Sequence, residues 1–92
     1  MIRVHLTRHV MEGLGERRLE RAWVERVATG AEWVEPSRAR AGAMLRFGRI
    51  DEAGGKVLRV TTIDENEVRV VVTAHFDRKA TRAVRKTDAD DL

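Results

Sequence analysis

Side chains that can hold a phosphate group or move a proton recur at alternate positions in the second half of the chain. The set consists of Arg46, Arg59, Thr61, Arg69, Thr73 and His75. Arginine stays charged at neutral pH and its planar fork matches phosphate oxygens, whereas histidine, whose ordinary pKa is about 6.5, can give or take a proton. The pattern predicts a phosphate-binding surface with His75 as an acid or base. An ordinary solvated sheet face is the alternative.

Cleavage of RNA through its own 2′-hydroxyl needs a base near that oxygen, cations around the scissile phosphate and an acid at the leaving oxygen. His75 and His9 are the candidates for the proton transfers, and Arg78 is the candidate for stabilising the charged phosphorus centre. The candidate RNA-binding residues are Arg46, Arg49, Arg59, Arg69, Thr73, Lys79 and Arg82. Structural roles are the alternatives. His9 would then cap or pack a helix start, and Arg49 and Arg59 would form exposed cross-strand ion pairs worth under about 1 kcal/mol each.

The three histidines lack the spacing of a metal site. His5 and His9 are four residues apart, but they straddle an expected strand–helix boundary, and the chain contains no cysteine. We therefore expect no metal site and no cofactor. The four aromatic residues, none of them tyrosine, offer no platform on which single-stranded RNA could stack its bases. This favours contacts to phosphates over recognition of bases.

The charge balance is mildly basic. Lys and Arg number 18 against 15 Asp and Glu, which gives a net charge of +3, and all but three of the cations are arginine. An arginine-rich composition suits phosphate or carboxylate ligands, but a GC-rich genome produces it without any ligand. The length of 92 residues is that of one domain with a modest core.

The first third of the chain predicts a strand followed by two helices. Residues 2–6 alternate apolar and polar side chains, as a half-buried strand does. Thr7 stands where a helix N-cap is expected, and the apolar stripe after it predicts a short helix ending near Gly15. A second amphipathic helix is expected from Leu19 to Thr29, with Gly30 as its C-terminal stop.

The rest of the chain predicts an antiparallel meander after an exposed loop over 37–42. Three strands are expected, at 44–50, 56–64 and 68–76, separated by glycine-bearing and polar turns. The predicted fold is therefore α+β, with two N-terminal helices packed on an antiparallel sheet of about four strands. Residues 78–86 could add a helical turn or two, and we expect one domain over 1–87 followed by a disordered acidic tail over 88–92.

Alternation also predicts the two faces of this sheet. The apolar set consists of Leu45, Phe47, Leu58, Val60, Val70, Val72, Ala74 and Phe76, and we expect the helices to cover it through Trp23 and Val27. The arginine, threonine and histidine set would then lie on the opposite face. Burial of Arg59 and Arg69 beneath the helices would show that the strand register is assigned wrongly.

Several short motifs along residues 3 to 80 are similar to one bacterial family. The N-terminal motifs are Thr7-Arg8-His9, Glu16-Arg17 and Leu19, and the later ones lie in 32–36, 46–50, 55–60 and 71–76. In this order they resemble the domain of unknown function numbered 4258. Arg18 and Glu20 depart from its pattern, where a glycine and a small hydroxyl residue are usual, so the second helix is expected to start less cleanly.

The segment from Thr73 to Ala80 also resembles, more distantly, the end of the sheet in BrnT toxins, which share the fold of the RelE and ParE toxins. This resemblance implies a toxin-like, RNA-directed endoribonuclease, with RNA or the ribosome as its target and a small antitoxin protein as its partner. Many such nucleases use a tyrosine, which this chain lacks. The alternatives are a toxin that acts on a protein, and a non-catalytic module that uses its basic sheet face to bind nucleic acid or an acidic protein.

No targeting segment is expected. The apolar stretch at the N-terminus is too short, and too interrupted by polar residues, for the apolar region of a signal peptide. No apolar run approaches the roughly 20 residues of a membrane span. The expectation is a soluble cytoplasmic protein.

Overall fold

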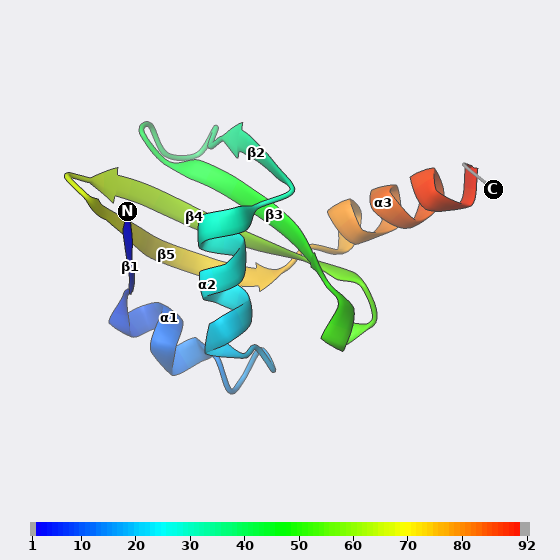
Figure 1. Cartoon of the computed structure of the whole chain (residues 1–92), viewed down its shortest axis with the longest axis horizontal. Helices are drawn as coiled ribbons and strands as arrows, with labels where there is room; N and C mark the ends of the chain where they lie inside the picture. The colour runs from blue at the N-terminus through cyan, green and yellow to red at the C-terminus, as the bar shows by residue number, and fades with distance from the viewer. Residues whose placement is uncertain (1, 91–92) are drawn as a thin grey trace.

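The computed structural model describes residues 2–90, and Figure 1 shows a curved sheet with two helices on one face and a third helix at one end. The elements follow one another as β1 (Arg3–Leu6), α1 (Arg8–Gly13), α2 (Arg21–Gly30), β2 (Trp33–Pro36), β3 (Met44–Ile50), the short 3₁₀ helix η1 (Asp51–Ala53), β4 (Lys56–Glu65), β5 (Val68–Phe76) and α3 (Arg78–Asp90). The fold is α+β, as predicted.

The sheet has five strands and is mixed, which corrects the expectation of about four antiparallel strands. Its strand order is β1-β5-β4-β3-β2. β1 runs parallel to β5, because the two helices that follow β1 carry the chain across one face of the sheet. The additional strand is β2, which pairs Trp33 with Phe47 and Pro36 with Met44 on β3.

The N-terminal helices cover one face, as expected. Thr7 is the N-cap of α1, where its side chain accepts a hydrogen bond of 3.4 Å from the Val10 amide. The core beneath these helices consists of Leu6, Val10, Leu19, Val24, Val27, Ala28, Ile50, Leu58, Val60, Val71 and Ala74. α2 comes close to β3 because Gly48 has no side chain, and a Cβ there would lie 3.1 Å from a Val27 methyl carbon.

The predicted faces are correct for β4 and wrong for β3 and part of β5. Arg46 is paired with Val60, so it lies on the helix-covered face, whereas Phe47 is paired with Arg59 on the opposite face. In β5 a register shift opposite Thr61 and Thr62 skips Val72. The extra residue of this bulge reverses the alternation, so Arg69 lies on the helix-covered face, while Val70 and Val72 do not.

The opposite face has an apolar cluster of its own. The Trp33 and Phe47 rings are stacked there with centroids 4.9 Å apart, and Val57 is fully buried nearby. α3 packs beside this cluster, and its Thr81 hydroxyl accepts a hydrogen bond of 2.8 Å from the Val57 amide. Both faces are therefore partly covered, which explains why Leu45 and Phe47 of β3 point away from α2 while Ile50 joins the core beneath the helices.

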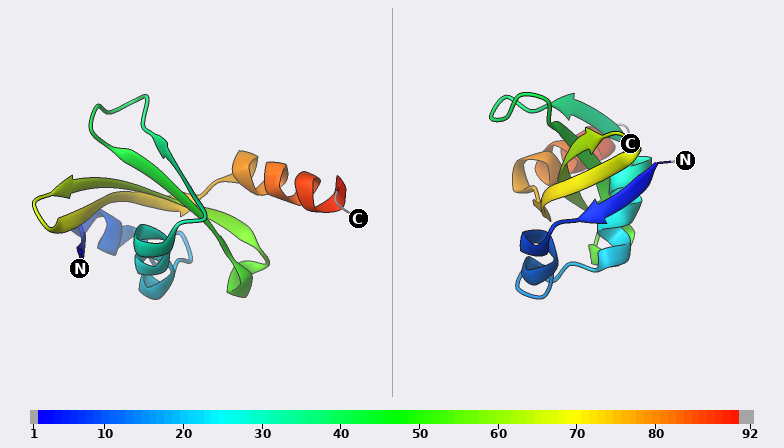
Figure 2. Two further views of the ribbon diagram at one scale, coloured as in Figure 1. Left: turned by 45° about the horizontal axis from the view of Figure 1, so that its top comes forward. Right: turned by 90° about the vertical axis from the view of Figure 1, so that its left-hand side faces the viewer.

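α3 is longer than the helical turn or two that we expected. It continues through Asp90 and so includes residues 88–90 of the expected disordered tail, while residues 91 and 92 lie outside the described part. Figure 2 shows that this helix projects beyond the end of the sheet. Between residues 2 and 90, no helix has the length and apolar character needed to cross a membrane.

Candidate nucleic-acid interface

One predicted group of site residues comes together on the face of the sheet opposite α1 and α2. Arg59 is paired with His75, and Thr61 with Thr73, on β4 and β5. They lie in a groove of about 480 Å³, here called the sheet groove, whose floor also contains Leu45 and Val72. The end of β2 and the loop that follows it form its wall, with Glu35, Pro36, Ser37, Arg38, Ala39 and Arg40. Apart from the hydroxyls, the polar side chains of this groove are mostly cationic.

Arg59 and His75 are joined by a short hydrogen bond. The distance from Arg59 Nη2 to His75 Nε2 is 2.8 Å, and His75 Nδ1 lies 3.2 Å from the Phe76 carbonyl oxygen. A guanidinium can only donate, so Nε2 accepts this bond and the ring is assigned as neutral with its proton on Nδ1. His75 Nε2 is therefore already occupied by Arg59 in this arrangement.

Asp77 holds the other side of the Arg59 guanidinium. Its Oδ2 lies 3.5 Å from Arg59 Nη1, and its Oδ1 accepts a bond of 2.8 Å from the Ala80 amide in the first turn of α3. The buried Nε of Arg59 has no hydrogen-bond partner among the described residues. Asp77 thus links the sheet groove to the start of α3, and Arg59 retains one donor without an acceptor.

The three predicted catalytic residues are not brought together. His9 is an exposed residue of α1, a helix that packs on the other face of the sheet from His75. Arg78 is the first residue of α3 and lines a different groove. The sheet groove therefore contains His75 without His9 or Arg78.

Two of the predicted RNA-binding arginines, Arg46 and Arg69, lie on the helix-covered face of the sheet and form hydrogen bonds there. Both Arg69 Nε and Nη2 contact the Asp64 carboxylate, at 2.8 and 3.0 Å, and Arg69 Nη1 donates to the carbonyl oxygen of Ala28 in α2. The hydrogen bond from Arg69 lowers the pKa of Asp64. Arg46 donates to the Thr62 hydroxyl, and burial together with the nearby Arg69 charge lowers its pKa. We assign both arginines a structural role.

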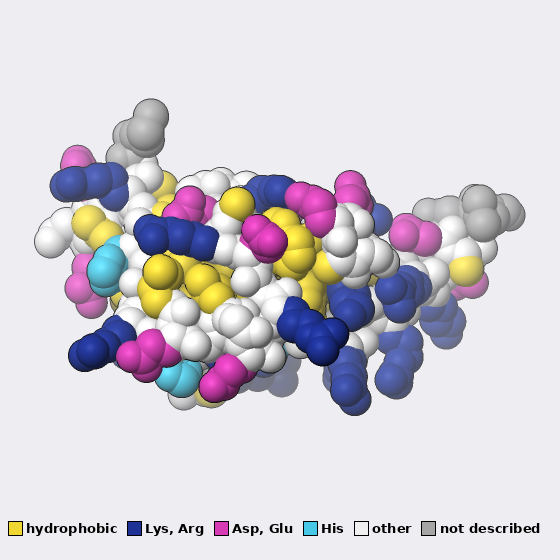
Figure 3. Space-filling model, turned by 90° about the horizontal axis from the view of Figure 1, so that it is seen from below, with side chains coloured by type: hydrophobic (Ala, Val, Ile, Leu, Met, Phe, Trp, Pro, Cys, Tyr) yellow, Lys and Arg dark blue, Asp and Glu magenta, His cyan; other side chains and the backbone are white. Residues whose placement is uncertain are grey.

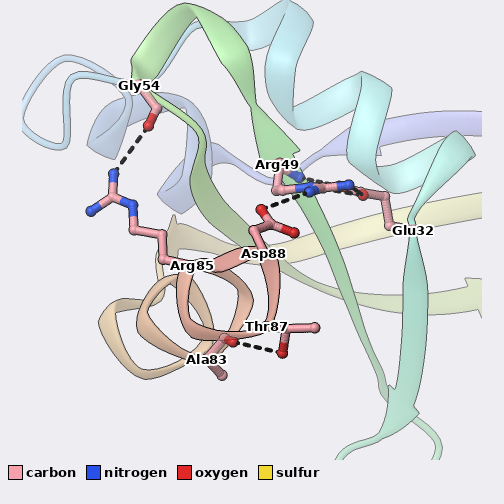
Figure 4. A network of polar contacts seen from close by, with 7 residues as sticks. All are labelled: Glu32, Arg49, Gly54, Ala83, Arg85, Thr87 and Asp88. Atoms are coloured by element: carbon pink, nitrogen blue, oxygen red, sulfur yellow. Dashed lines mark hydrogen bonds and ion pairs between the residues drawn. The ribbon is translucent and has the colours of Figure 1, made fainter. Parts of the chain in front are cut away.

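Arg49 is also held by acidic side chains (Figure 4). It binds Glu32 through Nε at 2.9 Å and through Nη2 at 2.7 Å, and its Nη1 lies 3.4 Å from Asp88 in the last turns of α3. The hydrogen bond from Arg49 lowers the pKa of Glu32. This network ties β3 to α3 and leaves little of the Arg49 charge for an external ligand.

The strongest concentration of uncompensated positive charge is on α3. Its cations are Arg78, Lys79, Arg82, Arg85 and Lys86, here called the basic stripe, and all five are exposed. Within residues 2–90 none of them is in an ion pair; Arg85 donates to the Gly54 carbonyl oxygen, which carries no formal charge. Lys and Arg side chains gather at the α3 end of the molecule in Figure 3.

A second groove, of about 470 Å³, lies beside the basic stripe. Its lining consists of Lys56, Phe76, Arg78, Thr81, Arg82 and Arg85. Lys56 lies 5.4 Å from the centre of the Phe76 ring, an attractive arrangement for a cation and an aromatic face. Of the predicted site residues, Arg78 and Arg82 lie here, and Lys79 lies on the same helix.

The predicted site residues did not include Lys56, Arg85 and Lys86 at this second site, or Arg38 and Arg40 at the sheet groove. The sequence did contain a signal for the basic stripe. The basic residues at positions 78, 82, 85 and 86 have the spacing that places side chains on one side of a helix. No comparable signal marks Lys56, which reaches the stripe only through the fold.

Within the described part of the chain, no cluster of three or more potential metal-ligating side chains forms. Comparisons of the chain with protein-family models, with curated proteins and with solved structures gave no match.

Proposed function

We propose that this domain binds RNA through its phosphates, using the basic stripe of α3 and the neighbouring Lys56. The observation that carries the proposal is that these six cations have no acidic partner among residues 2–90, whereas Arg49, Arg59 and Arg69 do. Cations without partners attract a polyanion without first breaking internal ion pairs. Phosphates supply most of the sequence-independent affinity for nucleic acid.

Contacts to phosphates are favoured over base stacking because the aromatic faces are engaged inside the domain. Trp33 and Phe47 stack on each other, and Phe76 is half-buried, with Trp23 6.4 Å away and Lys56 over its ring. Stacking on exposed aromatic rings is the usual mode for unpaired bases. Affinity should therefore depend strongly on salt and weakly on sequence.

The test is binding of a fluorescent RNA at several salt concentrations. Arg78→Ala and Arg82→Ala should each weaken binding at low salt and reduce the slope of log affinity against log salt by about 0.7 to 0.9, the value of one phosphate contact. Arg8→Ala is the matched control, because it removes an equally exposed arginine whose partner is Glu12 on α1. Binding that is insensitive to salt, or an equal loss in the control, would refute the proposal.

A second candidate is the toxin-like endoribonuclease, which the sheet groove favours. His75, Arg59 and the hydroxyls of Thr61 and Thr73 line one groove, on the face of the sheet opposite the N-terminal helices. A phosphate that drew the Arg59 guanidinium to itself would release His75 Nε2 for proton transfer. An antitoxin in such a pair would be a small protein with acidic groups facing these cations.

Cleavage is tested on RNA alone and with ribosomes. His75→Ala should lower the rate by roughly 10² to 10⁴ with RNA binding nearly unchanged, and products of 2′-hydroxyl attack should end in a 2′,3′-cyclic phosphate. His5→Ala, which changes an exposed histidine of β1, is the control. If neither substrate is cut by the wild type, the nuclease candidate is refuted and the RNA-binding proposal stands alone.

A further inference from the structure

The basic stripe occupies a narrow sector of α3. At about 100° per residue, the five cations fall within an arc of roughly 120°, and from Arg78 to Lys86 they extend about 12 Å along the axis. The side of α3 that contains Ala80, Thr81 and Val84 is turned to the sheet, where Thr81 bonds Val57 and Val84 lines a groove with Trp33. The cations are thus gathered on the remaining, outward side.

The acidic residues of α3 do not interrupt this sector. Asp88 lies on the docked side, where it contacts Arg49, and Asp90 falls at the edge of the arc beyond the last cation. Lys56 adds a sixth positive charge beside the stripe through the second groove. Six like charges held along one line are close enough to repel one another, so the stripe is suited to a ligand of high charge density.

The charge spacing distinguishes paired from unpaired nucleic acid. Five cations over about 12 Å of α3 amount to one positive charge per roughly 2.4 Å, before Lys56 beside them is counted. Double-helical DNA carries one phosphate per about 1.7 Å of axis, counting both strands, whereas a single strand in the same geometry carries one per about 3.4 Å. An RNA duplex likewise has two rows of phosphates, so a duplex can neutralise the whole stripe and a single strand only part of it.

The shape of the molecule supports the same choice. α3 projects from the body as a straight rod (Figures 1 and 2), and all five cations of the basic stripe are exposed. Because its other side is docked, the helix cannot sink into a deep groove, but it can lie across the phosphate rows that border the wide, shallow groove of A-form RNA. We propose that the basic stripe recognises double-stranded RNA, such as a hairpin stem, through both phosphate rows. This inference rests on the proposed RNA-binding function.

The experiment compares a short blunt-ended RNA duplex with each of its separated strands, at equal concentrations of phosphate. The duplex should bind about tenfold more tightly or better at near-physiological salt. The slope of log affinity against log salt should be about 5 for the duplex, from six contacts at 0.9 each, and about 2 to 3 for a strand, from three or four contacts at 0.7 each. A duplex that binds no more tightly than its strands would overturn this inference while leaving the RNA-binding proposal intact.

Two variants connect the result to the stripe. Lys86→Ala, an exposed change near the far end of the stripe, should reduce the duplex slope by about 0.9, and Arg21→Ala, an exposed arginine paired with Glu25 on α2, should leave it unchanged. Equal slopes for both variants would place the duplex elsewhere and overturn the inference. Failure of both duplex and strands to bind would refute the proposed function itself.

Discussion

Replacement of Thr81 by valine should destabilise the domain more than a surface substitution of the same kind. The Thr81 hydroxyl accepts a hydrogen bond from the Val57 amide at 2.8 Å and donates one to the Asp77 carbonyl oxygen at 2.7 Å. Thr81 is 7% exposed and Val57 is fully buried. Valine keeps the shape of threonine but removes the acceptor, so the Val57 amide is left buried without a partner.

The expected cost follows from this orphaned amide. An unsatisfied buried donor costs about 1–3 kcal/mol, and a domain of this size has a total stability of roughly 5–14 kcal/mol, so the loss is a sizeable fraction of the whole. The midpoint of thermal unfolding should fall by roughly 4–8 °C for each kcal/mol lost. Thr81→Ser keeps the hydroxyl and should recover most of the hydrogen-bond contribution.

Urea unfolding of Thr81→Val and Thr87→Val measures the difference. Thr87 is also a threonine of α3, but it is exposed and its hydroxyl donates only to the Ala83 carbonyl oxygen, so the valine variant should stay within about 0.5 kcal/mol of the wild type. Hydrogen exchange at the Val57 amide should become faster only in Thr81→Val. If both valine variants lose the same stability, the hydrogen bond does not anchor α3 to the sheet and the argument is wrong.

Two further predictions concern the helix-covered face and the ion pairs. Gly48→Val should cost about 1–3 kcal/mol in chemical denaturation because its Cβ would press on Val27, whereas Gly30→Ala, with open space around it, should cost far less. The Arg26 hydrogen bonds lower the pKa of Glu52 to about 2, so this carboxylate stabilises the fold above its ordinary pKa of 4.5 and loses that contribution as the pH falls towards 2. NMR titration should show a midpoint near 2 that moves towards 4.5 in Arg26→Ala. An unchanged midpoint in the variant would contradict that assignment.

The elements that the sequence predicted well are those whose signals are local. The Thr7 cap, the apolar stripe of α2 and the alternation in β4 depend on neighbouring residues, and the structure confirms all three. Turns were equally clear: Gly54, Gly55 and Asn66 have positive φ angles in the connections on either side of β4. A pattern that extends over only a few neighbouring residues can be interpreted without knowing how the rest of the chain folds.

β2 was missed for a physical reason. It has four residues, ends in Pro36 and lies at the edge of the sheet, where it pairs only with β3. Such a strand is too short to display a period of two, and proline lacks the amide that would extend its pairing. Its stability depends on contacts with distant residues, such as the stacking of Trp33 on Phe47.

The error in the sheet faces had two causes that no local pattern reveals. The Val72 bulge changes which residues of β5 share a face, and it falls in the run Val70-Val71-Val72, where no polar residue marks the change of alternation. In β3 Leu45 and Phe47 face the Trp33 cluster side, and the side that faces α2 presents Arg46 and Gly48 together with the buried Ile50. An apolar alternation shows that one face is buried but does not show which helix covers it.

The structure places the candidate site on α3 and not on the sheet face predicted from the sequence, because charge alone does not make an arginine available to a ligand. Arg69 is bound by Asp64, five residues away, and Arg49 by Glu32 in the connection before β2, so only the folded chain reveals that their charges are compensated. On α3 the situation is reversed, since the positions one turn apart from Arg78 and Arg82 are again basic, and the acidic residues of the helix come only in its last turn, where Asp88 contacts Arg49. The cations of the basic stripe can therefore pair with an external polyanion without first losing an ion pair inside the domain. We expect such a polyanion to bind at the basic stripe.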